Sequence, residues 1–591
     1  MKDIKEKINE WKIYEENKQY KENKQYKENE QYEENELKMK LHNENAYQYD
    51  DMLGKLEAYS KENIVPMHMP GAKRNSELIG RYMDDMPAPY DIDITEIDGF
   101  DNMHNADGMI KKAFEKTAAL YGADESLFLV NGSTAGNMAA ICGVTDKGDS
   151  IIVARNCHIS VYNAIILNEL DANYVYPQYD DEYGYYKGIS LREIKDTVEK
   201  NESMGKDIKA VVITSPTYEG NVSDIKNIAA YLHEHNIPLI VDEAHGAHFK
   251  FSCEFPQTAV EQGADIVINS VHKTLPSLTQ TAVMHINYGY VNVSKVKRYW
   301  NIYQSTSPSY ILMGSIDRCM SIIEKDGEYL FENYISKLKI LRNKLGQLKN
   351  IKLIDSDDIS KIVIGCDNAK KLYDILLNEY GIQLEMSSLK YAIAMTSIFD
   401  SAEYYDRFYN ALCEIDRRYN ANNINNSANN NQNYAEHYNI FNNTSSIKKA
   451  DIKVNIADFK NEALMSIAKA LNEGDKNGYD KIMMNDSSLY GRISAKMVYV
   501  YPPGIPILCP GEIISENVVN IISKAIENGL EVVGLELDGL EYPYTNDNIN
   551  DDLKYNSEDN LKNSLKNNLK DSRNDKNTKN EGCKGAFVCL K

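Results

Sequence analysis

Short apolar runs recur along the middle of the chain and predict a series of β-strands. They lie at residues 126–132, 149–155, 172–177, 209–215, 237–244, 264–270 and 280–286. Most are separated by segments in which apolar residues follow a helical spacing, such as 135–144 and 222–236. Asn236 ends the second of these, and we expect it at the helix C-cap because asparagine tolerates the left-handed conformation. The alternation indicates an α/β fold whose largely parallel sheet is covered by helices on both faces.

Three polar segments interrupt this pattern. Residues 14–37 repeat a six-residue unit, YEENKQ YKENKQ YKENEQ YEENEL, whose tyrosines would fall on different faces of a helix. We expect residues 1–49 to form a charged helical or disordered extension without a function of its own. Residues 420–446 and 545–580 are rich in Asn, Asp and Lys and predict insertions that bury no core. The chain then ends in the apolar run GAFVCLK, which predicts a closing strand within residues 581–591.

The composition narrows the class of protein. The chain has 591 residues and a formal net charge of -22, which argues against nucleic acid or an anionic membrane as the main partner. Its 9 cysteines are odd in number and widely spaced, so we expect reduced thiols rather than disulfides or a zinc site. The N-terminus is charged and lacks the apolar stretch of a signal peptide, and no apolar run approaches the about 18 residues that span a membrane. These features predict a cytoplasmic protein with no membrane partner.

The carboxyl ends of parallel strands are where such sheets bind ligands. After the first predicted strand comes NGSTAGN (131–137), in which Gly132 permits a tight turn and Ser133 and Thr134 supply hydroxyl groups. A helix is predicted to begin at once, and its free N–H groups and dipole favour an anion such as phosphate. The alternative is an ordinary Ser/Thr helix cap with no ligand.

Three further strand ends carry reactive side chains. His158 follows the second strand, where a lone histidine is more often structural than catalytic. Asp242 ends the fifth strand, and a partly buried carboxylate there needs a cation or an N–H partner. Lys273 follows the sixth strand beside hydroxyl residues, where desolvation would lower its pKa and make the amine a nucleophile for a Schiff base.

A metal site is the competing interpretation of the fifth strand end. Glu243, His245 and His248 lie close together in the sequence. The two histidines are three residues apart, however, whereas the two-histidine helical zinc motif needs a spacing of four. We therefore predict no metal.

Taken together, the strand ends fit pyridoxal 5′-phosphate. This cofactor needs a phosphate cradle, a lysine for its aldehyde and a carboxylate that keeps the pyridine nitrogen protonated. Ser133 with Thr134, Lys273 and Asp242 supply these groups, and His158 supplies a flat ring to stack on the cofactor. Because all of them follow strands of one predicted sheet, they are expected to meet at one edge.

A family resemblance supports this interpretation. The segments that carry it are MHMPGAKRN (67–75), DITEIDGFDNMHNADGMIKKAFEKTAALYGADESLFLVNGSTAGN (93–137), RNCHISVYNAI (155–165), SPTYEGNVSDI (215–225), VDEAHGAHF (241–249), SVHKTLPSLTQTAVMHI (270–286), STSPSYILMGSID (305–317) and VYPPGIPILCPGE (500–512). In these residues and their order the chain resembles the bacterial Orn/Lys/Arg decarboxylases, in a compact form without an N-terminal wing domain. The resemblance covers about residues 50–418 and 450–545.

The resemblance implies a fold and an assembly. The fold is that of fold-type I pyridoxal phosphate enzymes, with a seven-stranded, mostly parallel sheet in a large domain and a smaller C-terminal α/β domain. On this chain the large, cofactor-binding domain would span 50–325, and the small domain would comprise 326–419 and 447–544. The protein would be a homodimer or higher homo-oligomer with its active sites at the subunit interface. The loop at 67–75 and the segment at 500–512 would border the substrate channel.

The resemblance also implies the cofactor-binding residues. They are Ser133, Thr134, His158, Asp242, Ala244, His245, Ser270, His272 and Lys273. Lys273 would bind the aldehyde, Asp242 would pair with the pyridine nitrogen and His158 would stack on the ring. The serines, Thr134 and His272 would hold the phosphate or lie beside it, and Ala244 and His245 would lie near the other face or the 3-oxygen.

The implied activity is decarboxylation of arginine, lysine or ornithine to CO2 and a polyamine-pathway amine. Glu385 and Glu512 are candidates for contacting the distal cation of the substrate, although a solvated-surface or packing role is the more common one for a glutamate. The chain departs from the family at Ala72, where a histidine is usual, and at Ile159, where a lysine is common. Two alternatives stay open: another pyridoxal phosphate reaction, such as an aminotransferase or lyase, or a catalytically impaired relative with a regulatory role.

Overall fold

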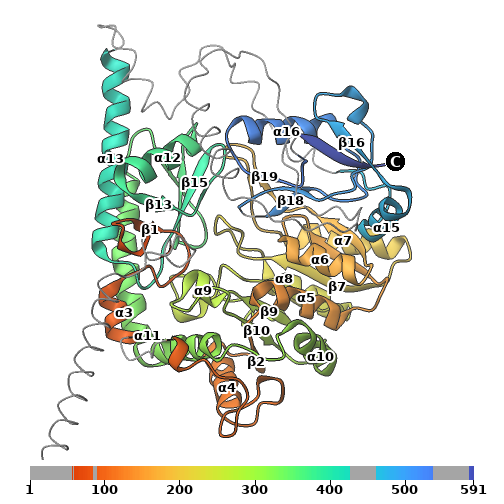
Figure 1. Ribbon diagram of the computed structural model, residues 1–591, viewed down its shortest axis with the longest axis horizontal. Helices are drawn as coiled ribbons and strands as arrows, with labels where there is room; N and C mark the ends of the chain where they lie inside the picture. The colour runs from red at the N-terminus through yellow and green to blue at the C-terminus, as the bar shows by residue number, and fades with distance from the viewer. Residues whose placement is uncertain (1–55, 57–58, 84–88, 426–460, 503, 537–584) are drawn as a thin grey trace, which may run out of the picture. The chain divides into compact units, whose positions relative to one another are not determined.

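The computed structural model describes residues 56, 59–83, 89–425, 461–502, 504–536 and 585–591 (Figure 1). The predicted extension at 1–49 and the predicted insertion at 545–580 lie outside these residues, as does most of the insertion at 420–446. The chain from Val65 onward forms one compact unit. No helix in the described part of the chain has the length and apolar character that crossing a membrane requires.

A seven-stranded sheet forms the centre of the large domain, in the order β2-β10-β9-β8-β7-β3-β4. Its strands are β2 (Glu125–Leu129), β3 (Ser150–Ala154), β4 (Asp171–Val175), β7 (Ile208–Thr214), β8 (Leu239–Asp242), β9 (Ile266–Asn269) and β10 (Ala282–Ile286). Each lies within or overlaps one of the apolar runs predicted as strands. Only β10 runs antiparallel to its neighbours, and the other pairings are parallel. The predicted α/β fold with a mostly parallel seven-stranded sheet is therefore confirmed.

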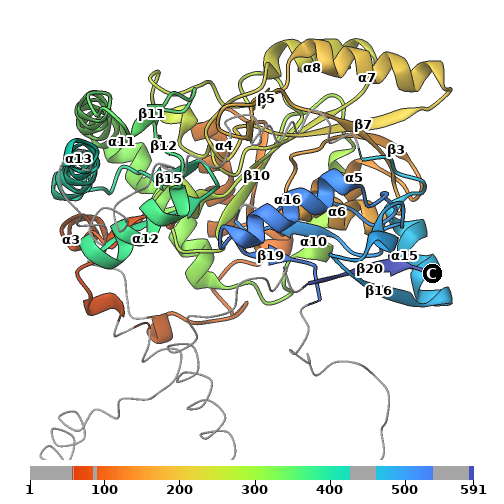
Figure 2. The ribbon, with the colours of Figure 1, turned by 90° about the horizontal axis from the view of Figure 1, so that it is seen from above.

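Helices cover both faces of this sheet, as Figure 2 shows. The helices of the large domain are α4 (Met109–Tyr121), α5 (Gly132–Val144), α6 (Ile159–Leu167), α7 (Leu191–Ser203), α8 (Ile225–Glu234), the one-turn α9 (Val271–Thr274) and α10 (Val293–Tyr303). One face carries α5, α6 and α10, and the other carries α7 and α8. The strands β8 and β9 are buried throughout, which explains their continuous apolar runs. The C-cap of helix α8 is His235 rather than the predicted Asn236, which follows it with a left-handed φ of 57°.

A second region begins with the long helix α11 (Tyr310–Leu345). It contains the antiparallel sheet β11-β12-β15-β14 and two more helices. Its elements are β11 (Lys352–Ile354), β12 (Lys361–Gly365), α12 (Ala369–Tyr380), β13 (Ile382–Leu384), β14 (Met386–Ser387), β15 (Tyr391–Met395) and α13 (Ala402–Asn425). The N-terminal strand β1 (Val65–Met67), which precedes α3 (Ser76–Met83), pairs in parallel with β13. The predicted domain boundary at residue 325 falls inside α11, so the division into domains stays a prediction.

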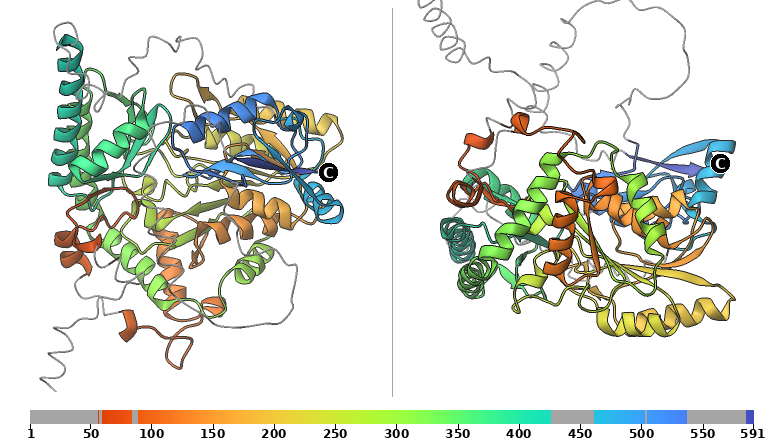
Figure 3. Two further views of the ribbon diagram at one scale, coloured as in Figure 1. Left: turned by 45° about the horizontal axis from the view of Figure 1, so that its top comes forward. Right: turned by 90° about the horizontal axis from the view of Figure 1, so that it is seen from below.

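A third region holds the C-terminal strands (Figure 3). It comprises α15 (Ile467–Asn477), β16 (Tyr479–Met483), β17 (Val498–Val500), β18 (Ile505–Leu508), α16 (Glu516–Glu527), β19 (Val532–Val533) and β20 (Ala586–Leu590). The strand β20 lies where the closing strand was expected and pairs antiparallel with β16. Strand β17 pairs with β18 and β19, and α15 lies against α6 of the large domain. The C-terminal region thus packs against the large domain at α6.

Candidate active site

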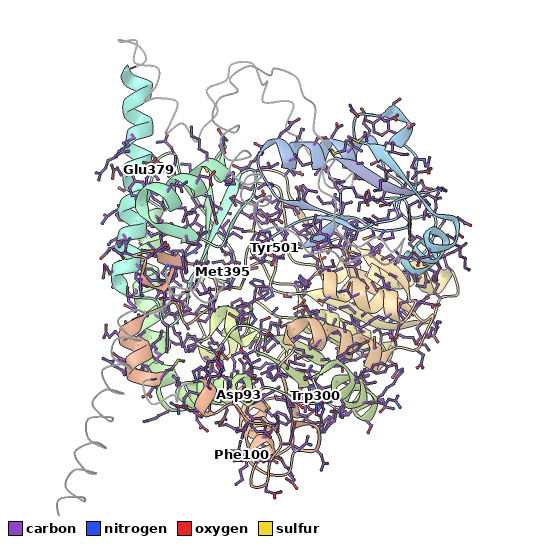
Figure 4. The ribbon with its side chains drawn as sticks, in the orientation of Figure 1. Asp93, Phe100, Trp300, Glu379, Met395 and Tyr501 are labelled. Atoms are coloured by element: carbon purple, nitrogen blue, oxygen red, sulfur yellow. The ribbon has the colours of Figure 1, made fainter. Side chains whose placement is uncertain are left out.

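A cavity of about 640 Å³ lies at the carboxyl ends of the central strands. Its walls come from the large domain, from the short hairpin of β5 (Tyr179–Asp180) and β6 (Tyr185–Tyr186), from residues 385–391 and from the segment around Tyr501. Tyr501 is labelled in Figure 4, where it lies between the C-terminal strands and the large domain. Every residue predicted to bind the cofactor lines this cavity: Ser133, Thr134, His158, Asp242, Ala244, His245, Ser270, His272 and Lys273. The structure therefore brings the whole predicted set together.

The N-terminus of α5 forms one end of the cavity. Gly132 has a φ of 75°, a conformation that favours glycine, and it turns the chain from β2 into the helix. No side chain caps this helix, because the side chain of Asn131 at the N-cap makes no such bond. The Oγ atoms of Ser133 and Ser270 lie 2.5 Å apart and bring together two strand ends. Free N–H groups, a helix dipole and paired hydroxyls suit a phosphate group.

Lys273 lies on α9, directly after β9. Its Nζ is 2.9 Å from Nε2 of His245. Desolvation lowers the pKa of Lys273, and the negative charges of Asp242 and Glu385 oppose that shift. Burial, followed by the charge of Lys273, holds the pKa of His245 well below its usual value, so the imidazole is neutral. A neutral histidine can accept a hydrogen bond from the lysine and so orient its amine.

Asp242 is the last residue of β8 and is almost fully buried. Its Oδ2 accepts a hydrogen bond from Nδ2 of Asn137 at 2.9 Å, and its Oδ1 accepts one from the backbone N–H of Ala244 at 3.1 Å. Asn137 also donates to Oγ of Ser160 at 3.0 Å. Neutral donors thus fix the orientation of the carboxylate, and its charge is not cancelled by a salt bridge.

His158 is the N-cap of α6, where its Nδ1 accepts a hydrogen bond from the backbone N–H of Ser160 at 3.2 Å. The Oγ of Ser160 lies 2.9 Å from the same nitrogen. Burial lowers the pKa of His158, the charge of Asp242 raises it and that of Lys273 lowers it. Ile159, which departs from the family pattern, begins α6 but does not line the cavity, and neither does Ala72.

The residues weighed as a metal site do not converge. The carboxylate of Glu243 accepts hydrogen bonds from the Thr258 hydroxyl and the Ala259 N–H, whereas His248 bonds through Nε2 to Asp358 at 3.2 Å. Among the residues described, no group of three or more His, Cys, Asp or Glu side chains could hold a metal ion.

Glu512 is not positioned as a substrate contact. It is almost fully buried and forms a salt bridge of 3.2 Å with Arg155. The guanidinium of Arg155 also donates to the carbonyls of Pro506 at 2.6 Å and Ile507 at 3.3 Å. Glu512 further accepts a bond from Nδ2 of Asn461 at 3.0 Å and does not line the cavity. This pair instead fastens the segment 505–512 to the end of β3, which the sequence could not reveal.

Sequence reasoning missed several polar residues of the cavity wall. Tyr218 and Glu219 lie soon after the end of β7, a strand end for which the sequence alone suggested no chemistry. Tyr391 and the tyrosines of the β5–β6 hairpin also line the cavity, and no local pattern marks them. Glu385, the other candidate for the distal cation, does lie in this wall.

Comparisons with known proteins agree with this geometry. Residues 52–379 match the Orn/Lys/Arg decarboxylase major domain, and residues 451–538 match the C-terminal domain of the same family. Arginine decarboxylase from Bacillus anthracis is 30% identical over 496 residues, which are 81% of this chain and 94% of the relative. Arginine decarboxylase from Bacillus subtilis is 28% identical over 496 residues, with the same coverage of 81% and 94%.

Among solved structures, lysine decarboxylase A from Pseudomonas aeruginosa shares the fold. Its TM-score is 0.65 at 17% identity, and the match covers 92% of this chain and 84% of that one. The profile of the major domain alone spans more than half of the chain. The chain therefore belongs to the Orn/Lys/Arg decarboxylase family.

Proposed function

We propose that this protein decarboxylates a basic L-amino acid, arginine, lysine or ornithine, with the help of pyridoxal 5′-phosphate. The observation that carries the proposal is the placement of Lys273 and Asp242 in one cavity with a phosphate-type helix end. The matches to arginine decarboxylases support the basic substrate. Family membership supports the cofactor.

The polar groups of the cavity suit this cofactor. Oδ1 of Asn137 and Nδ1 of His245 are buried without a hydrogen-bond partner in the described part of the chain. Buried polar atoms of that kind are uncommon in proteins and are often satisfied by a ligand or water. Both residues line the cavity, so its wall contains unmet hydrogen-bonding capacity.

Each residue then has a defined task. The N-terminus of α5 with Ser133, Thr134 and Ser270 would hold the phosphate, and Lys273 would bind the aldehyde carbon. The pyridoxal ring, when bound, supplies the electron sink for the bond that releases CO2. Asp242 would keep a proton on the pyridine nitrogen, because Asn137 orients its carboxylate without neutralising the negative charge.

Two histidines would position the cofactor ring and the amine of Lys273. His158 is anchored through Nδ1 to Ser160, which fixes its ring plane at the cavity wall. His245 is neutral beside Lys273, and its Nε2 would orient the lysine amine through a hydrogen bond. His272 would lie beside the phosphate, with its Nδ1–H donating to the carbonyl of Thr281 at 2.9 Å.

We also propose that the protein works as a homodimer or higher homo-oligomer. Large apolar side chains are exposed in the segment around α4, including Phe100 at 47% and Met109 at 50%. Figure 4 labels Phe100 at the outer edge of the large domain. Analytical ultracentrifugation should give a dimer or larger species, and a monomer at micromolar concentration would refute this part of the proposal.

A substrate panel tests the reaction. The purified protein, supplied with pyridoxal 5′-phosphate, is incubated with arginine, lysine and ornithine, and CO2 and the product amine are measured. We expect stoichiometric release of CO2 and amine from at least one of them. Formation of a keto acid would instead identify an aminotransferase, and cofactor binding with no turnover of any of the three would identify a catalytically impaired relative.

A further inference from the structure

Besides Asp242 and the exposed Asp181, two carboxylates line the cavity. Glu219 lies five residues after β7 and is 7% exposed. Glu385 lies between β13 and β14 of the second region, and its backbone N–H donates to the carbonyl of Ile393. Both belong to the wall of the same cavity as Lys273. Neither has a task in cofactor binding.

A tyrosine holds Glu219 in place. The hydroxyl of Tyr391 donates to Oε1 of Glu219 at 2.6 Å. The ring of Tyr391 is buried and lies 5.5 Å from the ring of Tyr185 in the hairpin, edge to face. The carboxylate is therefore oriented by a side chain that is itself fixed by packing.

A second tyrosine holds Glu385 and connects it to the reactive lysine. The hydroxyl of Tyr218 donates to Oε1 of Glu385, and the backbone N–H of Met69 donates to Oε2 at 2.9 Å. The ring of Tyr218 meets the ring of His245 at 4.6 Å between centroids. His245 is the residue in contact with Lys273, so Glu385 lies two side chains away from the proposed point of chemistry.

These two carboxylates lack a cation. Within the described part of the chain, neither Glu219 nor Glu385 has a Lys, Arg or His nitrogen within 4.0 Å. Arg155, another lining residue, is already paired with Glu512. Burial raises the pKa of Glu219, as expected for a carboxylate with no positive partner. A cationic ligand would supply the missing charge and offset the cost of burial.

Aromatic rings complete the wall. Tyr179, Tyr183, Tyr185 and Tyr186 of the hairpin region line the cavity together with Tyr218 and Tyr391. Tyrosine faces attract ammonium and guanidinium groups, and their apolar surface suits the methylene stem of a basic side chain. Acidic groups set among tyrosines therefore fit a long side chain that ends in a cation.

We propose that Glu219 and Glu385 bind the side-chain cation of the substrate, with Tyr391 and Tyr218 as the positioning residues that aim them. This inference rests on the proposed decarboxylase function and names the specificity-determining residues of that site. Of the two glutamates considered from the sequence, it keeps Glu385 and sets aside Glu512, which is paired with Arg155, and it adds Glu219.

The test compares Glu219→Gln and Glu385→Gln with the wild-type holoenzyme. We expect KM for the preferred basic amino acid to rise about 10- to 100-fold in each variant, because a charged hydrogen bond is lost. The kcat at saturation should change far less, and the visible absorbance of bound cofactor should be unchanged.

Two further variants sharpen the test. Tyr391→Phe keeps the buried ring and should raise KM less than Glu219→Gln does. Glu182→Gln is the matched control, since Glu182 is an exposed carboxylate of the same hairpin that does not line the cavity.

A binding measurement separates this inference from the proposed reaction. Calorimetry on the cofactor-loaded protein measures the affinity for 1,5-diaminopentane and for agmatine, with 1-aminopentane as the probe that lacks the second cation. The Gln variants should lose affinity for the two dications by about 10-fold or more and keep the affinity for 1-aminopentane. If the wild type turns over a basic amino acid while both variants keep its KM and the dication affinities, the inference is wrong and the function stands. If the wild type releases no CO2, the function fails, and the dication affinities alone decide the inference.

Discussion

Two lysine–aspartate pairs in this protein are arranged in opposite ways. In the second region, Lys361 and Asp358 are fully buried and form a salt bridge of 3.1 Å. At the cavity, Lys273 and Asp242 influence each other electrostatically but are not within 4.0 Å. Neutral groups satisfy them instead, His245 for the lysine and Asn137 for the aspartate.

The difference shows how one protein uses the same residue types for stability and for chemistry. A lysine that is paired with a carboxylate keeps its proton, and its amine is not available as a nucleophile. Keeping Lys273 apart from Asp242 leaves the amine free to react and the carboxylate free to bind a cation. Lys73 is a third arrangement: its ammonium is buried and donates to the carbonyls of His68 at 2.8 Å and Met395 at 2.6 Å.

Removing the cavity lysine should have the largest effect on activity. We expect Lys273→Ala to lower CO2 release by about 1,000-fold or more, since the group that binds the aldehyde is lost. The visible absorbance of the bound cofactor should disappear, while the thermal unfolding temperature should stay the same or rise. Undiminished absorbance in this variant would refute the role of Lys273.

Removing Lys361, the lysine of the buried salt bridge, should instead lower the stability of the protein. Lys361→Met leaves the buried carboxylate of Asp358 with His248 and Ser360 as partners but without its lysine, and we expect it to lower the free energy of unfolding by about 3–5 kcal/mol. Urea titration followed by circular dichroism measures the loss. The double variant Lys361→Met with Asp358→Asn should recover part of it, because no charge is left unpaired. A stability equal to wild type in the single variant would break the contrast between the two pairs.

His272, which lines the cavity, should contribute to the pH dependence of stability. Burial lowers the pKa of His272 to about 4, from an ordinary value near 6.5, so the folded protein favours the neutral ring. Between these values the unfolded chain binds the extra proton, and stability therefore falls as pH drops from 6.5 to 4. In protein without added cofactor, His272→Asn should reduce this loss by up to about 3 kcal/mol.

Comparing His272→Asn with wild type separates the contribution of His272 from that of groups whose pKa shifts change stability with pH in the opposite direction. Burial raises the pKa of Glu243 to about 7, so its contribution to stability falls as pH rises from about 4.5 to 7. Equal pH slopes for His272→Asn and wild type would show that His272 does not titrate as its environment implies.

The smallest predicted effect concerns the hydrogen bond by which Asn137 orients Asp242. Asn137→Ala removes a single hydrogen bond to this carboxylate, and we expect cofactor affinity to fall by about 5- to 10-fold. A titration of cofactor absorbance measures it. Asn201→Ala is the control, because it removes a single hydrogen bond of another buried asparagine, to the carbonyl of Thr197, outside the cavity. Equal affinities in both variants would mean that Asn137 does not orient the aspartate.

Local signals made much of the fold and site predictable. Each strand of the central sheet is an apolar run, and a parallel sheet brings the ends of its strands to one edge, so Ser133, Asp242 and Lys273 could be placed together. The phosphate-type helix end was visible in the glycine and hydroxyl residues that come after β2. These inferences needed no knowledge of contacts between distant residues.

The parts that escaped prediction depend on such contacts. Glu512 looked available for a substrate until the structure showed Arg155, more than three hundred residues earlier, bound to it. Tyr391 meets Glu219 across 172 residues, and no local pattern announces that pair.

Covalent mapping of the cofactor tests the central claim most directly. The protein is incubated with pyridoxal 5′-phosphate, reduced with borohydride, digested and analysed by peptide mass spectrometry. We predict a single modified lysine, Lys273, and no modification of Lys361 or Lys73, because Lys361 is paired with Asp358 and Lys73 with backbone carbonyls. Modification of Lys361 or Lys73 in place of Lys273, or no modified lysine at all, would contradict the assignment of Lys273 as the reactive residue.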